Sequence, residues 1–185
     1  MAVFFSVIAA LILFFIIVMI LDCNRFVVRK YRCREEKLKK DVKFILLSDL
    51  HNKSFGKKNA RLLKAIDKIG ADMILIAGDM YTSATGGDIE TAAELVCTLA
   101  EKYPVYYGNG NHEHKTRLFP KDFLDMYRKF SEKIASAGVN HLINEKISLP
   151  DLNMDIYGLE IDREYFRKFK EIQMEETYLE KLLGK

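Results

Sequence analysis

The sequence predicts an α/β protein in which a mostly parallel sheet with flanking helices follows one transmembrane helix. Three observations support this. The first 21 residues are apolar except for Ser6 and carry no charged side chain. Beyond Asp41, short apolar runs of strand length alternate with amphipathic helical patterns, which indicates right-handed βαβ crossovers and a parallel sheet. Three of the apolar runs also end abruptly in polar clusters.

Residues 1–21 are predicted to form a transmembrane anchor, because Ser6 is their only polar side chain. A helix of this length would span ~32 Å, enough to cross a ~30 Å hydrocarbon core. A cleaved signal peptide would need a basic start, a shorter apolar stretch and a cleavage site with small residues, and none is present. A buried helix of a soluble protein is disfavoured by the length of the uninterrupted apolar run.

Residues 22–41 are predicted to form a basic juxtamembrane linker, in which eight Lys or Arg stand against three acids between Asp22 and Lys40. The simplest interpretation is a solvated linker helix. Beside a membrane span, however, the same cations would be drawn to anionic headgroups on the cytoplasmic side. Because no side-chain charge precedes the span, the positive-inside rule predicts a single-pass protein of the cell membrane with its body in the cytoplasm.

Composition narrows the function classes. The net charge of the whole chain is +3, so with a strongly basic linker the remainder is slightly acidic. No nucleic-acid partner is therefore expected. The three cysteines form neither a C-x-x-C motif nor a disulfide framework, which suits a reducing compartment.

Residues 42–185 are predicted to form the α/β domain. Its first strand, Phe44–Leu47, is four consecutive apolar residues, a pattern typical of a parallel strand buried on both faces. Further strands are predicted at 73–77, 105–107, 143–149 and 154–159, the last two joined by a hairpin-like turn. Helices are predicted from Asn59 to Gly70, after Asp88, from Pro120 to Ala137, and in the charged tail 162–185.

The polar clusters follow the first three strands, at 48–51, 78–79 and 108–113. Parallel strands place all three at one edge of the sheet, where such folds bind ligands. Each cluster alone has a plainer explanation: a surface Asp–His pair, a turn, or Gly and Asn in a tight loop. Together they predict a shared metal site.

The segments Asp49-Leu50-His51, Gly78-Asp79 and Gly110-Asn111-His112-Glu113 resemble the first three signature blocks of the calcineurin-like metallophosphoesterase superfamily. With the span ahead of them, they resemble its membrane-associated bacterial phosphodiesterases. The resemblance implies two divalent metal ions, either Mn, Fe or Zn. The implied roles are Asp49 and His51 on the first ion, Asp79 bridging both ions, Asn111 on the second, and His112 as a catalytic residue beside the leaving-group oxygen.

The resemblance thus implies a hydrolase that cleaves a phosphomonoester or phosphodiester. Two such ions would clamp the phosphoryl group of the phosphorylated substrate. A catalytic site tethered close to the bilayer would favour lipid-linked phosphates as its substrates. Glu113 is expected to support its loop by hydrogen bonding, and His114 and His141 are expected to be structural.

The sequence departs from the superfamily after His141, because no later histidine follows and the terminal Gly-His-x-His block is absent. We therefore expect a domain truncated at its C-terminal side, as a fragment of a longer reading frame. Its second ion would have only Asp79 and Asn111 as protein ligands, so the 185-residue chain should have little or no activity. The alternative is a non-catalytic truncated remnant or a membrane-bound binding module.

Overall fold

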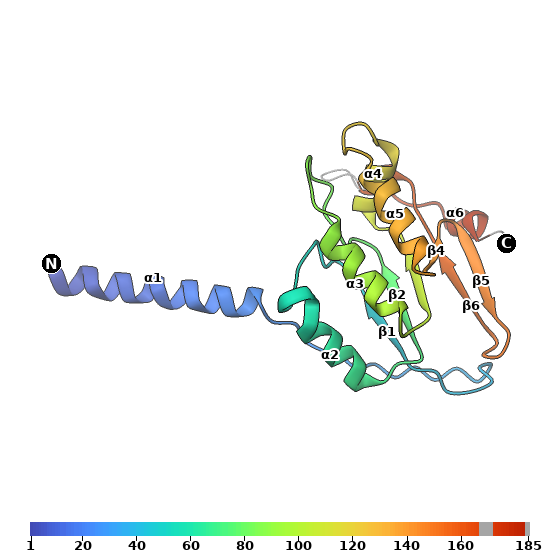
Figure 1. Ribbon diagram of the computed structural model, residues 1–185, viewed down its shortest axis with the longest axis horizontal. Coiled ribbons are helices and arrows are strands. Elements are labelled where there is room, and N and C mark those ends of the chain that lie inside the picture. The colour runs from blue at the N-terminus through green and yellow to red at the C-terminus, as the bar shows by residue number, and fades with distance from the viewer. Residues whose placement is uncertain (167–171, 184–185) are drawn as a thin grey trace.

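The structure, a computed structural model, describes residues 1–166 and 172–183. A long helix, α1 (Ala2–Cys23), projects from an α/β domain (Figure 1). The central sheet has the order β1-β2-β3-β4, and all its strands are parallel. The strands are β1 (Phe44–Leu47), β2 (Met73–Ala77), β3 (Val105–Gly108) and β4 (Asn140–Leu142), with a separate antiparallel pair, β5 (Glu145–Leu149) and β6 (Met154–Gly158). The predicted α/β class is confirmed.

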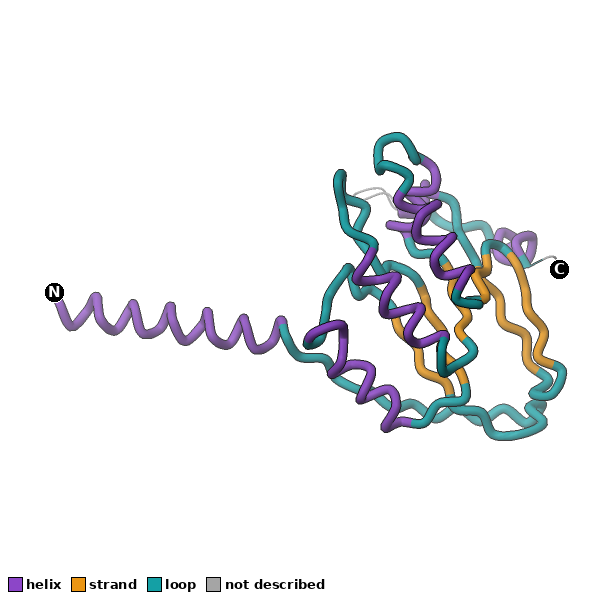
Figure 2. Tube along the Cα trace, in the orientation of Figure 1, coloured by secondary structure: helices purple, strands orange, loops and turns teal. Residues whose placement is uncertain are grey.

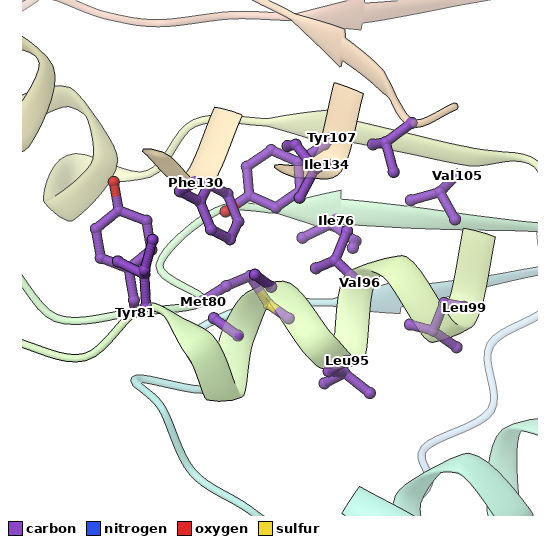
Figure 3. Close-up of a cluster of buried hydrophobic side chains, with 14 of the residues drawn as sticks. Ile76, Met80, Tyr81, Leu95, Val96, Leu99, Val105, Tyr107, Phe130 and Ile134 are labelled. Carbon is purple, nitrogen blue, oxygen red and sulfur yellow. The ribbon is translucent and has the colours of Figure 1, made fainter. Parts of the chain in front are cut away.

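The domain has three layers. The helices α2 (Ala60–Ile69), α3 (Glu90–Ala100) and α5 (Met126–Ser136) pack on one face of the sheet (Figure 2). Tyr107, Phe130 and Ile134 are fully buried between the sheet and these helices (Figure 3). Alternate strand residues, among them Met73 and Tyr106, point to the other face and contact the β5–β6 hairpin.

The strand β1 is not buried on both faces, so that prediction is wrong. Phe44 is 48 % exposed and Leu46 is 62 % exposed, whereas Ile45 and Leu47 pack against the helical layer. The physical reason is the position of β1 in the sheet. β1 is an edge strand, and the hairpin contacts β3 and β4 instead.

Two helix predictions need correction. The helix predicted from Pro120 starts only at Met126, because Leu124 and Asp125 both have positive φ. A helix that was not predicted, α4 (Asn111–Leu118), begins inside the third polar cluster. The remaining elements among the described residues are two short 3-10 segments and one further helix: η1 (Lys57–Asn59), η2 (Arg163–Phe166) and α6 (Glu176–Leu182). Of the predicted tail helix 162–185, η2 and α6 are present and residues 172–175 are not helical, while 167–171 and 184–185 lie outside the described residues.

The basic segment after α1 forms no helix and lies on the domain. At its start, the rings of Phe26 and Phe55 meet edge to face with centroids 5.1 Å apart. Towards its end, Lys39 Nζ donates to Pro150 O (2.8 Å), and Asn153 Nδ2 donates to Lys37 O (2.9 Å). The segment therefore runs along the domain to the β5–β6 turn (Figure 2).

The helix α1 is long and apolar enough to cross a membrane. Its 22 residues span ~33 Å, and its apolar window has a mean hydropathy of 3.3 and packs against no other part of the described chain. A signal sequence near the N-terminus can also be long and apolar enough to meet this criterion.

Candidate metal centre

The three polar clusters meet at one edge of the sheet, as predicted. The parallel pairing of β1 with β2 and of β2 with β3 puts their carboxyl ends side by side. Backbone hydrogen bonds continue past the strand ends: Asp49 N donates to Gly78 O (3.2 Å), and His51 N donates to Asp79 O (3.0 Å). The first two clusters are thus held in register by the backbone as well as by the strands.

The backbone at this edge is strained. Asp49, His51 and Asp79 all have positive φ, at 56°, 47° and 53°. Residues other than glycine rarely adopt this region, and such conformations persist where the surrounding contacts impose them. Here those contacts are the backbone hydrogen bonds between the first two clusters, and strain of this kind gathers at functional sites.

Two glycines let the second and third clusters touch. Gly78 has a φ of +70°, and a Cβ on it would lie 1.9 Å from Gly110 N. A Cβ on Gly110 would lie 2.3 Å from Asp79 Oδ1. Neither position can carry a side chain without moving the other loop. This close approach places the Asp79 carboxylate at the start of α4.

The N-terminus of α4 holds the Asp79 carboxylate. Asp79 Oδ1 accepts a hydrogen bond from His112 N (2.8 Å). In the amide orientation that pairs both of its polar atoms, Asn111 donates through Nδ2 to Asp79 Oδ2 (2.8 Å). A helix N-terminus stabilises negative charge, and here it lies against a carboxylate of a residue that is only 8 % exposed. The predicted ligands Asp79 and Asn111 are therefore direct neighbours.

The Glu113 side chain links the second and third polar clusters through hydrogen bonds. Its fully buried carboxylate accepts hydrogen bonds from the backbone N–H groups of Asp79 (2.8 Å), Met80 (3.0 Å) and Gly110 (3.0 Å), and from the Tyr107 hydroxyl (2.8 Å). Burial raises the pKa of Glu113, while these donors oppose that rise. The expectation that Glu113 supports its loop by hydrogen bonding is confirmed.

Three side chains that could bind a metal lie close together at the carboxyl ends of the strands. The ligand atoms of His51, Asp79 and His112 all lie within 4.8 Å of one another. The two imidazole rings are 4.9 Å apart, edge to face. Asp49 lies outside this group, with Oδ1 3.8 Å from His51 Nε2 and Oδ2 accepting from the Ser48 hydroxyl (2.5 Å).

The donor set fits a divalent transition metal. Imidazole nitrogen and carboxylate oxygen are ligands of Zn, Fe and Mn, and an amide oxygen adds a neutral donor. His51 and Asp79 lie close enough to share an ion, with Asn111 touching Asp79 and Asp49 beside His51. The residues at this edge can therefore hold a metal.

His112 is better placed to donate a proton than to bind the ion. Its Nδ1 accepts a hydrogen bond from the backbone N–H of Ser83 (2.8 Å), so in the neutral ring the proton is on Nε2. A nitrogen that carries a proton cannot coordinate a metal. Burial lowers the pKa of His112, which favours the neutral ring. The sequence offered no signal for this contact with Ser83.

Glu160 is a second residue that sequence reasoning missed. It lies just after β6 and is only 7 % exposed. Its carboxylate accepts from Arg117 Nη2 (2.8 Å) and lies 2.8 Å from His114 Nδ1, so it ties the hairpin to α4. His141 Nε2 is 2.7 Å from Asn109 Oδ1, and burial lowers the pKa of His141 to about 4. His114 and His141 thus occupy structural positions, as expected.

Comparison with known proteins agrees with this geometry. The profile of the calcineurin-like phosphoesterase family matches residues 42–181. An uncharacterised metallophosphoesterase of Campylobacter jejuni is 27 % identical over 124 residues, which are 66 % of this chain. The match covers only 30 % of the length of that protein. No solved structure matches the chain significantly.

Proposed function

The chain belongs to the calcineurin-like phosphoesterase family, and from this premise we propose that it is a metal-dependent phosphoesterase with a dinuclear centre, which hydrolyses a phosphomonoester or phosphodiester. The observation that carries the proposal is the convergence of His51, Asp79 and His112 at the carboxyl ends of β1, β2 and β3. Divalent metal ions bound there would polarise the phosphoryl group and lower the pKa of a coordinated water.

The residues divide the work as follows. Asp49 and His51 would hold the first ion, Asp79 would be the ligand shared by both ions, and Asn111 would contribute to the second. Asp79 suits the bridging position because it is the only carboxylate of the close group and lies against Asn111. His112 presents Nε2–H to the oxygen of the leaving group and donates its proton as the P–O bond breaks.

Replacing His112 by alanine tests this proposal and separates proton donation from metal binding. Alkyl phosphate esters need a proton on the departing oxygen, whereas nitrophenyl esters hardly do. We expect His112→Ala to slow alkyl ester hydrolysis about 100-fold or more, to slow nitrophenyl ester hydrolysis much less, and to leave Mn²⁺ affinity unchanged. Steady-state rates with both esters, together with calorimetric Mn²⁺ titration, measure this.

Ser83→Ala is the matched control, because it removes the hydroxyl near His112 Nδ1 but keeps the backbone N–H that sets the tautomer. It should retain most of the activity. Equal loss with both esters and weaker Mn²⁺ binding in His112→Ala would instead make His112 a metal ligand. Because a weak second metal site fills only at high metal concentration, these assays include millimolar Mn²⁺. A wild-type chain with no turnover of either ester even there would contradict the proposed function and favour a non-catalytic binding module.

We further propose that α1 anchors the protein in the cell membrane and that the domain is cytoplasmic. The support is the apolar length of α1 and the excess of Lys and Arg directly after it. An anchored site meets lipid-linked phosphates more often than soluble ones, so these are the favoured substrates. Turnover of phosphatidate in vesicles, compared with that of a soluble alkyl phosphate, tests the preference.

Labelling of Cys33 tests the orientation. Cys33 is exposed and lies ten residues after the end of α1. In a variant that carries Cys23→Ser and Cys97→Ser, a membrane-impermeant maleimide should label Cys33 only after the cells are opened, because the cations around it favour the cytoplasmic side. Labelling in intact cells would place the domain outside.

A further inference from the structure

The domain surface next to the membrane anchor is set by contacts at the end of α1. Only Asn24 and Arg25 separate the helix end from Phe26, which packs on Phe55. Arg61 Nη1 of α2 also donates to Asn24 O (3.1 Å). The helix therefore continues almost directly into the domain, and α2 lies beside its end (Figure 1). If α1 crosses the membrane, α2 lies at the membrane surface.

The outer face of η1 and α2 carries a row of four cations, here called the basic stripe. Arg61, Lys64 and Lys68 follow helical spacing along one exposed face of α2, and Lys57 is exposed in η1 just before it, so the stripe consists of Lys57, Arg61, Lys64 and Lys68. The opposite face of α2 carries the buried residues Leu62 and Ile66. The three stripe cations of α2 therefore point away from the core, and Lys57 is exposed beside them.

The stripe is not neutralised from within the domain. The one acid of α2, Asp67, accepts from Lys102 (2.9 Å) and from Tyr103. Glu94 of α3 pairs with Lys58, which lies off the stripe. Among the described residues, Lys57, Lys64 and Lys68 have no ion-pair partner, so their charges remain available to an external anion.

We propose that the basic stripe binds the anionic lipid headgroups around the membrane anchor. The inference rests on the proposed membrane span, and the charge complementarity is direct. Each Lys or Arg held near an anionic surface favours the bound state about fivefold. The loop that contains Lys57 leads back to His51 at the candidate metal centre, so docking would also hold that edge of the sheet at a fixed distance from the bilayer.

Lysine acylation of the full-length chain in proteoliposomes tests the stripe without requiring activity. We expect Lys57, Lys64 and Lys68 to react at least about fivefold more slowly in vesicles that contain phosphatidylserine than in pure phosphatidylcholine. The difference should disappear in 0.5 M NaCl, where the Debye length is about 4 Å. Lys129, exposed on α5 and without an ion pair among the described residues, is the internal control and should react equally in both.

A charge variant completes the test. K64Q/K68Q should abolish the protection of Lys57, whereas the matched variant K129Q should not. Equal acylation of the three stripe lysines in both lipids would overturn the proposal. So would protection by an added oligonucleotide but not by anionic vesicles, since that would assign the stripe to nucleic acid. Because acylation does not depend on turnover, failure here is distinguishable from failure of the proposed phosphoesterase activity.

Discussion

Replacing Asp79 by asparagine is expected to lower metal-dependent hydrolysis more than about 100-fold, since losing even an outer-shell partner of a metal ligand costs ten- to hundredfold. Asp79 supplies the only carboxylate of the close group with His51 and His112. Asparagine keeps the shape and an oxygen that can accept from His112 N. It removes the negative charge that would hold the two proposed divalent ions. The fold should survive while Mn²⁺ affinity falls.

Calorimetric Mn²⁺ titration and ester hydrolysis measure both effects, with Asp88→Asn as the matched control. Asp88 accepts from Glu90 N (2.7 Å) at the start of α3, and asparagine can do the same. This control should keep wild-type Mn²⁺ affinity and turnover. Tight Mn²⁺ binding with undiminished turnover in Asp79→Asn would show that other ligands form the site.

The same titration addresses the number of ions. Of the described residues, we assign only Asp79 and Asn111 to the proposed second ion, and two oxygen ligands would hold a transition metal weakly. We therefore expect one tightly bound Mn²⁺ per chain and an activity that keeps rising into the millimolar Mn²⁺ range. Two tightly bound ions would contradict this ligand count.

The second large effect is expected from Glu113→Ala, which should destabilise the domain by about 3 kcal/mol or more. The substitution leaves three backbone N–H groups and the Tyr107 hydroxyl without their acceptor. An unsatisfied buried donor costs roughly 1–3 kcal/mol. For a domain of this size, 3 kcal/mol lowers the melting temperature by roughly 6–12 °C.

Thermal denaturation followed by circular dichroism measures the loss. Glu113→Gln keeps one acceptor oxygen and should fall between wild type and Glu113→Ala. Glu132→Ala removes an exposed carboxylate that pairs with Arg128 on α5 and should leave the melting temperature unchanged. If Glu113→Ala has the same melting temperature as the wild type, the stability of the loops at the metal centre does not depend on this carboxylate.

The sequence predicted the layout of the site well, because it depends on local signals. Apolar runs ending at Ser48, Gly78 and Gly108 mark strand ends, and parallel pairing then brings the clusters together. The helix α4 was missed, since its polar start at Asn111 shows no apolar periodicity. The exposure of Leu46 could not be predicted either, because an edge strand and a central strand can have the same four residues.

Other features depend on tertiary packing alone. Ser83 meets His112 and Glu160 meets Arg117 across 29 and 43 residues of sequence, and no spacing rule connects them. The late start of α5 is similar, since the positive φ of Leu124 and Asp125 interrupts a pattern that reads as helical. These contacts are the ones that set the tautomer of His112 and tie the hairpin to α4.

The contacts between the basic segment and the β5–β6 turn also constrain how the protein folds during synthesis. Lys39 and Pro150 are 111 residues apart, and Lys37 and Asn153 are 116 apart. At ribosomal rates of 5–20 residues per second, the chain needs roughly 6–23 seconds to grow from one partner to the other. During that interval α1 has already been synthesised. The β5–β6 turn, which will bind the basic segment after α1, has not yet been made. The contacts between the basic segment and the β5–β6 hairpin therefore form late in the synthesis of the domain.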